Sequence, residues 1–203
     1  MGKSRMLPVA EIFLSAQGEG CFAGTLAVFI RLAGCNLNCR FCDTDHRPRY
    51  QMTVKDIVEK VKRLGRDEGK THVVITGGEP TIHSLLEKLV VALKKEVNCF
   101  IQLETNGSAP RTDCLGLFDW ITCSPKQIPS EAVLKHVDEL KLLVSRDGLL
   151  VPEKVLPKLT QGKKVYIQAL WRDKGAAQKC LELLKEHPEW RISFQGHKTL
   201  ELP

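Results

Sequence analysis

The sequence lacks any long apolar segment. None of its hydrophobic runs approaches the ~20 residues that a membrane-spanning helix requires. The first ten residues carry basic side chains but no apolar core of the length found in secretory signal peptides. Low-complexity stretches, internal repeats and blocks of like charge are also missing. These absences favour a cytoplasmic protein with no membrane partner, and they argue against a disordered chain.

The remaining composition is typical of a soluble globular domain. Hydrophobic residues make up 43% and charged residues 27% of the 203 residues, which is enough to build one core of its own. We therefore expect a single domain over residues 1–203. The formal charge of +6 is spread along the chain, which suits an anionic small-molecule substrate and gives no sign of a nucleic-acid partner.

Short β-branched runs alternate with helical periodicity through the middle of the chain. Such alternation is typical of a parallel sheet with right-handed crossovers. The strands are too few for a closed eight-stranded barrel, so the pattern predicts a partial barrel or an open α/β sheet. The expected strands span residues 28–31, 72–76, 100–104, 120–124, 140–144, 165–168 and 192–195.

Several helices have recognisable ends. Thr53 and Gly65 can cap a helix whose apolar side chains share one face. Ser84 and Glu87 have the spacing of a capping box and predict the start of a second helix. Pro157 argues against one of the later helices. These later helices are expected near residues 130–136, 152–160 and 174–186.

Polar residues follow the predicted strands, at the point where each strand ends. The carboxyl ends of parallel strands share one face of the sheet, and active sites are built there. We therefore expect six separate segments to converge on one cavity. These segments are Gly34-Cys35, Thr76–Pro80, Glu104–Gly107, Ser124–Lys126, Gln168 and Gln195–Lys198.

Three of the eight cysteines form a C-x3-C-x2-C motif: Cys35, Cys39 and Cys42. Thiolates are soft ligands that suit zinc or an iron–sulfur cluster. A structural zinc site takes four protein ligands, whereas three cysteines leave one iron of a [4Fe–4S] cluster open to a small molecule. Because His46 could complete a Cys3His zinc site, the motif alone leaves both metal centres open.

Two segments together resemble the radical S-adenosylmethionine enzymes. An aromatic residue, Phe41, precedes the last cysteine of the motif, and Thr76–Pro80 is similar to the GGEP segment of that superfamily. The resemblance implies an incomplete (β/α) barrel of about six parallel strands. It also implies a [4Fe–4S] cluster on Cys35, Cys39 and Cys42, with S-adenosylmethionine on the open iron. Reduction would then yield a 5′-deoxyadenosyl radical that takes a hydrogen from the substrate.

A narrower resemblance, over most of the chain, is to the 7-carboxy-7-deazaguanine synthase family. Members convert 6-carboxy-5,6,7,8-tetrahydropterin to 7-carboxy-7-deazaguanine and ammonia by a radical ring contraction, on the route to queuosine. The resemblance implies Mg2+ dependence, a homodimer and an electron donor such as flavodoxin or ferredoxin. It is carried by Phe13–Gly20, Val28–Cys35, Cys42–Thr44, Glu104–Gly107, Ser124–Lys126 and Gln195-x-His197-Lys198.

This family resemblance also implies roles for individual residues. Thr44 is expected at the Mg2+ ion, although Asp43 beside it is an equally suitable oxygen ligand. The residues expected to contact S-adenosylmethionine are Gly78, Glu79, Ser124, Pro125, Lys126, Gln168, Ala169, Leu170 and Trp171. Those expected to contact the pterin are Ala16, Gln17, Gly18, Arg31, Thr76 and Pro203, the last through a terminal carboxylate.

Some of these roles have simpler alternatives. Arg31 ends an apolar strand, where its guanidinium needs a partner: either the substrate carboxylate or an ion pair with Glu19 or Glu104. Lys126 could be a solvated turn residue. Two positions depart from the family pattern. They are Ala16, where leucine is more common, and Ala169, where proline is more common.

Two other functions compete with this interpretation. A radical enzyme that installs a glycyl radical on a partner protein would share the cysteine motif, but the Gln17–Gly20 and Cys42–Thr44 segments argue against it. A non-enzymatic zinc or electron-transfer module would use the same cysteines without cleaving S-adenosylmethionine.

Overall fold

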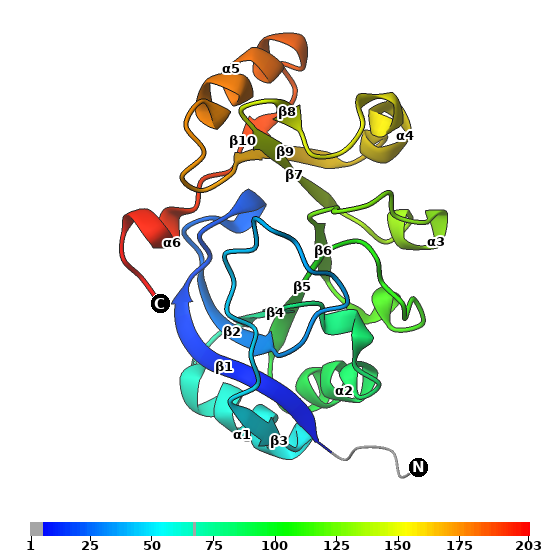
Figure 1. The fold of residues 1–203 in the computed structure, drawn as a ribbon. Coiled ribbons are helices and arrows are strands. Elements are labelled where there is room, and N and C mark those ends of the chain that lie inside the picture. The colour runs from blue at the N-terminus through cyan, green and yellow to red at the C-terminus, as the bar shows by residue number, and fades with distance from the viewer. Residues whose placement is uncertain (1–5, 67) are drawn as a thin grey trace.

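One curved sheet, with helices around its outside, forms the framework of the chain (Figure 1). The structure is a computed structural model and describes residues 6–66 and 68–203. Seven strands run parallel to their neighbours, as expected for alternating β and α units. They are β2 (Leu26–Leu32), β4 (Thr71–Gly77), β5 (Cys99–Thr105), β6 (Trp120–Cys123), β7 (Glu139–Ser145), β9 (Lys164–Ala169) and β10 (Arg191–Ile192).

Three further strands were not predicted: β1 (Leu7–Ala16), β3 (Tyr50–Met52) and β8 (Gly148–Leu149). The strand β1 pairs antiparallel with β2, and β3 pairs antiparallel with β1. The resulting order is β10-β9-β7-β6-β5-β4-β2-β1-β3, with β8 beside β7. In the described residues the two edges do not pair with each other, so the sheet is an incomplete (β/α) barrel.

The first helix confirms the local prediction. α1 (Val54–Leu64) has Thr53 as its N-cap, in a capping box with Asp56, and Gly65 as its C-cap. The capping box expected at Ser84 is wrong, because α2 (Leu86–Glu96) begins after Leu85 without a side-chain cap.

The start of α2 is decided by the segment in front of it. The 3-10 helix Pro80–Ile82 ends at His83, whose carbonyl accepts from the Leu86 N–H at 3.1 Å. The chain therefore enters α2 directly from a preceding turn, and Ser84 lies inside that turn.

The later helices are shorter than expected. Pro157 is compatible with α4 because it lies in the first turn, where its missing N–H leaves no intrahelical bond unmade. The strand expected up to residue 195 ends at Ile192, and the chain then forms the short helix α6. These helices are α3 (Glu131–Leu134), α4 (Leu156–Thr160), α5 (Ala176–Glu186) and α6 (Gly196–Thr199).

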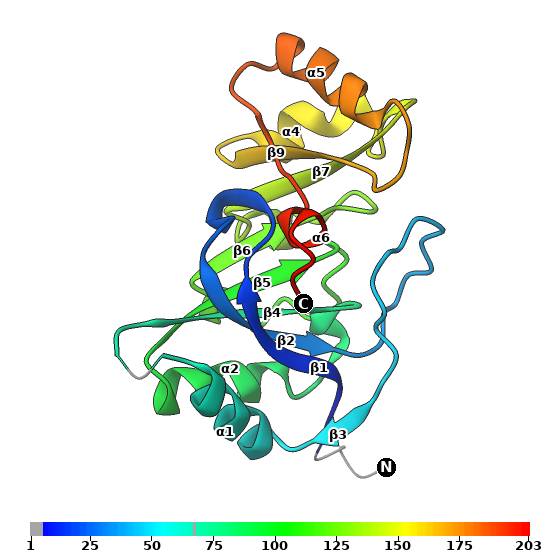
Figure 2. The ribbon, with the colours of Figure 1, turned by 90° about the vertical axis from the view of Figure 1, so that its left-hand side faces the viewer.

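The C-terminal end of the chain returns to the end of β1. Gly196 N, at the start of α6, donates to Gly18 O at 3.0 Å (Figure 2). A side chain at position 18 would collide with His197, since a Cβ there would lie 2.3 Å from His197 Nδ1. This contact places the last residues of the chain over the carboxyl ends of the strands. Among the described residues, no helix has both the length and the apolar character needed to span a bilayer.

Candidate active site at the carboxyl ends of the strands

A cavity of about 480 Å3 opens at the carboxyl ends of the parallel strands. It receives residues from all six segments that the sequence analysis expected to converge there, and from β1. All but two of the predicted site residues line it; the exceptions are Glu79 and Pro125. The lining residues among those predicted are Ala16, Gln17, Gly18, Arg31, Cys35, Cys39, Cys42, Thr44, Thr76, Gly78, Ser124, Lys126, Gln168, Ala169, Leu170, Trp171 and Pro203.

The three motif cysteines are free thiols on the loop that follows β2. Cys35 and Cys39 are half-buried, and Cys42 is exposed. Burial raises the pKa of the Cys39 thiol, and the ammonium of Lys126 opposes this shift. The Asn106 amide lies 3.9 Å from Cys35 Sγ as a donor. Three thiols beside a cation and an amide donor suit an anionic iron–sulfur cluster.

The thiols are not yet gathered around a common centre. Within the described residues, no three His, Cys, Asp or Glu side chains stand at metal-binding spacing. This holds for the three cysteines with or without His46, whose backbone carbonyl accepts from Gly34 N at 2.9 Å.

The glycine pair after β4 is required by the neighbouring strand. Gly77 has φ +144°, and a Cβ there would lie 2.0 Å from Leu32 O. A Cβ on Gly78 would lie 2.0 Å from Gly34 O and 2.8 Å from Cys35 Cβ. The two glycines thus allow β4 to end directly against the start of the cysteine loop.

Glu79 lies behind the residues that line the cavity, and its contact with S-adenosylmethionine stays a prediction. Its side chain is fully buried, and its carboxylate accepts four hydrogen bonds from three residues. Thr81 donates through N and Oγ1, Thr105 through Oγ1 at 2.9 Å, and Asn106 through N at 2.7 Å. Glu79 therefore ties the end of β4 to the end of β5, behind the cavity wall.

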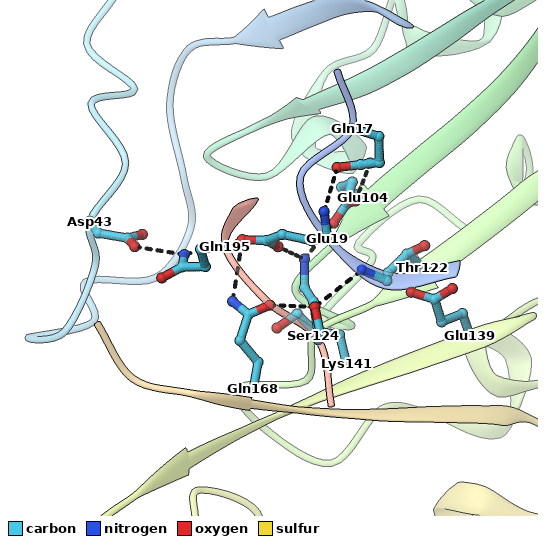
Figure 3. A network of polar contacts seen from close by, with 12 residues as sticks. Gln17, Glu19, Asp43, Glu104, Thr122, Ser124, Glu139, Lys141, Gln168 and Gln195 are labelled. Carbon is cyan, nitrogen blue, oxygen red and sulfur yellow. Dashed lines mark hydrogen bonds and ion pairs between the residues drawn. The ribbon is translucent and has the colours of Figure 1, made fainter. Parts of the chain in front are cut away.

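A buried ion cluster forms one wall of the cavity (Figure 3). The ammonium of Lys141 binds both Glu19 and Glu104. Burial opposes the charge on Lys141, but the two carboxylates outweigh it and raise its pKa. Burial likewise opposes ionisation of Glu19, and Lys141 outweighs it, so the pKa of Glu19 is lowered. The sequence analysis gave no role to Lys141; a lysine within the apolar run 140–144 was the available signal.

Glutamine amides surround the two carboxylates. Gln168 and Gln195 donate to Glu19 Oε1 at 3.2 and 3.1 Å, and Gln17 donates to Glu104 Oε1 at 3.2 Å (Figure 3). This wall therefore offers carboxylate oxygens and amide groups from four different segments of the chain.

Arg31 lines the cavity, and its protein partner is Glu11. The Arg31 Nε lies 2.7 Å from Glu11 Oε1 on the adjacent strand β1, and the guanidinium lies 5.8 Å from the centroid of the Phe13 ring. The alternative ion pairs with Glu19 or Glu104 are wrong, because those carboxylates bind Lys141. Among the described residues Arg31 has no other hydrogen-bond partner, so its two Nη groups are left for a ligand.

Lys126 is a half-buried cavity residue rather than a solvated turn lysine. Its Nζ donates to Ser124 Oγ at 2.7 Å and to Ser124 O at 3.0 Å. Burial, together with the charge of Lys141, lowers the pKa of Lys126 to about 8. Pro125, between these two residues, is buried and lies outside the cavity lining, and its cofactor contact stays a prediction.

Thr44 lines the cavity next to an aspartate that is already engaged. The Asp43 carboxylate binds Lys198 and accepts from Gln195 Nε2 at 3.2 Å. Burial favours the neutral acid, but the bonds from Lys198 and Gln195 outweigh it and lower the pKa of Asp43. Of the two candidate Mg2+ ligands, Thr44 is the one whose side chain has no such partners among the described residues.

The segment 168–171 after β9 completes the opposite wall. Gln168 accepts from Ser193 Oγ at 2.8 Å, and this bond ties β9 to the strand end beside it. Ala169 and Leu170 continue the lining, and Trp171 is 47% exposed with the Lys198 ammonium 4.8 Å from its ring centroid. Although Ala169 stands where proline is more common in the family, the segment still lines the cavity.

Fold and site together define the class of protein. The family profile described as the Radical SAM superfamily matches residues 29–141, which contain the cysteine loop and the glycine pair. The chain belongs to this superfamily, whose members carry a [4Fe–4S] cluster and S-adenosylmethionine.

More similar relatives identify the family within that class. The chain is 39% identical to the 7-carboxy-7-deazaguanine synthase of Synechocystis sp. over 95% of this chain and 92% of that protein. It is 33% identical to that of Bacteroides thetaiotaomicron over 97% and 99%. The crystal structure of QueE from Escherichia coli superposes with a TM-score of 0.75 at 28% identity, covering 95% of each chain. The chain belongs to the 7-carboxy-7-deazaguanine synthase family.

Proposed function

We propose that this chain converts 6-carboxy-5,6,7,8-tetrahydropterin to 7-carboxy-7-deazaguanine and ammonia, in the biosynthesis of queuosine. The observation that carries the proposal is the convergence of the cysteine loop, the glycine pair and a free guanidinium end on one cavity. When bound, the [4Fe–4S] cluster and S-adenosylmethionine supply the 5′-deoxyadenosyl radical that removes a hydrogen from the substrate.

Cys35, Cys39 and Cys42 would hold the cluster, and the glycine turn after β4 would take part in holding S-adenosylmethionine. Gly78 lets the cofactor approach the backbone closely, and Glu79 supports this turn from behind through its bonds to β5. The other cofactor contacts come from two facing segments of the lining. They are Ser124, Lys126, Gln168, Ala169, Leu170 and Trp171.

Arg31 binds the carboxylate of the pterin. Glu11 fixes the guanidinium through Nε, which leaves a planar pair of Nη donors for a carboxylate. Thr76, from the end of β4, and Pro203 line the same cavity and contact the substrate. The Ala16–Gly18 segment adds backbone groups and the Gln17 amide along the pterin edge.

The ion cluster orients the pterin ring. Glu19 and Glu104 carry two negative charges against the single positive charge of Lys141, so the wall keeps one net negative charge. A pterin presents several N–H donors along one edge, and carboxylate oxygens are strong acceptors for them. Lys141 keeps both carboxylates ionised and fixes their positions.

Mg2+ is held at Thr44, with the remaining ligands from substrate oxygens and water. A hard cation there neutralises the substrate carboxylate together with Arg31. An electron-donor protein such as flavodoxin or ferredoxin reduces the cluster, and the functional unit is a homodimer. Omitting Mg2+ from the assay tests the metal, and Thr44→Ala is expected to raise the Mg2+ concentration needed for half-maximal rate.

An anaerobic assay of the reconstituted, untagged protein tests the function. It contains dithionite, S-adenosylmethionine, Mg2+ and 6-carboxytetrahydropterin, with the product followed by mass spectrometry. We expect Cys39→Ala to lose both 5′-deoxyadenosine and product. Arg31→Ala is expected to keep the cluster and lose the product.

The outcomes separate the competing functions. Release of 5′-deoxyadenosine without any deazaguanine would support the radical chemistry and refute the proposed pterin substrate. Bound zinc in place of iron would refute both the radical chemistry and the substrate, and would favour the zinc module.

A further inference from the structure

A second hollow lies beside the cysteine loop, on the outer side of the active-site cavity. It is open to solvent and shares Phe41, Leu170 and Trp171 with the cavity lining. Phe41 directly precedes Cys42, the exposed cysteine of the motif. The hollow therefore reaches the surface where the cluster-binding loop itself is exposed. Its lining residues are Phe41, Arg146, Leu170, Trp171, Arg172, Asp173 and Lys174.

The rim of this hollow is positively charged. Arg146, Arg172 and Lys174 are all exposed, and Arg146 has 70% of its side chain accessible. The single acidic lining residue, Asp173, is only 16% accessible and lies 3.6 Å from Arg146 Nε. The surface therefore presents Arg172 and Lys174, which form no ion pair within the described residues, together with Arg146 beside a shielded carboxylate. It also presents two exposed aromatic rings, Phe41 and Trp171.

The loop after β9 is shaped to present this rim. Asp173 N donates to Leu170 O at 3.2 Å, which closes a turn with Trp171 and Arg172 at its tip. Arg172 has φ +65°, a backbone region that favours glycine at this position of a turn. A long cationic side chain stands at that position in spite of the backbone strain. Both residues at the tip of the turn, Trp171 and Arg172, are exposed.

We propose that this basic and aromatic rim is the docking surface for an acidic one-electron carrier protein that reduces the cluster. The inference rests on the cluster of the proposed function and assigns the place where its electron enters. The carrier loses one electron and the cluster gains one, with no bond made or broken. Electron-transfer encounters are small and transient, so a few charges around two apolar rings are sufficient contact. Opposite charge steers such a partner to the exposed edge of the cysteine loop.

Charge reversal of the rim tests the proposal on the reconstituted holoenzyme. The variant Arg146→Glu/Arg172→Glu/Lys174→Glu is mixed with reduced flavodoxin, and reduction of the cluster is followed by its loss of absorbance. We expect the second-order rate constant to fall by about 10- to 100-fold, while reduction by dithionite stays at the wild-type rate. The matched control reverses three exposed lysines on α1 and α2, at the other end of the molecule: Lys55→Glu/Lys88→Glu/Lys95→Glu.

Two further measurements keep the test decisive if the triple variant does not hold a cluster. The wild-type rate with flavodoxin should fall steeply as salt is added, because salt screens the steering charges. Arg172→Gly removes one charge while relieving the strained backbone, and should lower that rate by roughly 2- to 5-fold without loss of stability.

The proposal is overturned if rim and control variants are reduced by flavodoxin at the same rate, or if the wild-type rate does not depend on salt. Because reduction of the cluster needs no pterin, the rate of reduction by flavodoxin can be interpreted even if the ring-contraction assay fails. A rim that instead binds polyanions such as DNA as tightly as flavodoxin would also refute a dedicated carrier site.

Discussion

The ammonium of Lys141 donates to Glu104 Oε2 at 2.9 Å, deep in the wall of the cavity, and also binds Glu19 (Figure 3). The three groups come from the turn after β1, from β5 and from β7, which are far apart in the sequence. Their side chains are only 7–15% accessible, so each charge depends on the others for its stability. The same contact that stabilises the fold fixes two carboxylates in the cavity wall.

Replacing Lys141 should therefore damage stability and activity together. Lys141→Met leaves two buried carboxylates without a counter-charge, and we expect the free energy of unfolding to fall by about 3–5 kcal/mol at pH 7. Because the folded pKa of Glu19 lies below its ordinary value of 4.5, its stabilisation is present above about pH 4.5 and is lost as the pH falls further. Urea unfolding from about pH 2 to pH 8 measures both effects.

A surface ion pair supplies the control for this variant. Lys179 and Glu182 on α5 are 3.0 Å apart at the surface, so Lys179→Met should cost far less than Lys141→Met. Equal losses in the two variants would show that the buried cluster contributes no more than a surface pair.

Glu139 should make the wild-type protein less stable at pH 7 and above than at pH 4.5. Burial raises its pKa from 4.5 to about 7, although Cys21 N donates to its Oε2 at 2.9 Å; its Oε1 is buried without a partner among the described residues. When the pKa of an acid is higher in the folded than in the unfolded protein, the free energy of unfolding falls as the pH rises from the unfolded-state pKa through the folded-state pKa. Stability should therefore fall between about pH 4.5 and 7 and then level off.

The variant Glu139→Gln should remove this loss. We expect it to be near neutral at pH 4.5 and to gain up to about 3 kcal/mol over wild type at pH 8. Urea unfolding of both proteins at the two pH values checks the prediction. A constant difference between the proteins would mean that Glu139 does not titrate in this range.

Glu11 should control how well Arg31 holds the substrate. Glu11→Gln removes a charged bond to Arg31 Nε, and a charged hydrogen bond contributes roughly 1.5–3 kcal/mol. We expect KM for the pterin to rise by about 10- to 100-fold, with the rate of S-adenosylmethionine cleavage in the absence of the pterin unchanged. Steady-state kinetics with both readouts tests this. An unaltered KM would show that Arg31 does not bind the substrate carboxylate in the way proposed.

Gly78→Ala should prevent cluster binding. The new Cβ would lie 2.0 Å from Gly34 O and 2.8 Å from Cys35 Cβ, so the cysteine loop must shift. We expect the iron content and the cluster absorbance after reconstitution to fall to a small fraction of the wild-type values. Gly116→Ala is the matched control, since its Cβ would meet only His136 Cε1 at 3.6 Å. Full iron loading of Gly78→Ala would contradict the steric argument.

Much of the site was predictable because its signals are local. The cysteine spacing, the glycine pair and the caps of α1 depend on residues close together in the sequence, and the alternation of strands and helices indicates which strand ends share a face. Together with the family resemblance, these patterns indicated a set of site residues, all of which line the cavity except Glu79 and Pro125.

Features that the local signals did not indicate come from contacts with other segments. The Glu79 carboxylate, for example, accepts hydrogen bonds from Thr81, Thr105 and Asn106. Ser84 has the spacing of a cap, yet the preceding 3-10 turn sets the start of α2.

By itself, the sequence determined the parallel α/β class, the metal-binding loop and the chemistry that this loop can support. Tertiary structure alone decided that β1 lies antiparallel beside β2 and so gives Arg31 the partner Glu11. It also decided that Lys141 joins Glu19 to Glu104. The physical reason is that a charge buried by folding must find its counter-charge wherever the chain brings one, and sequence distance does not limit that choice.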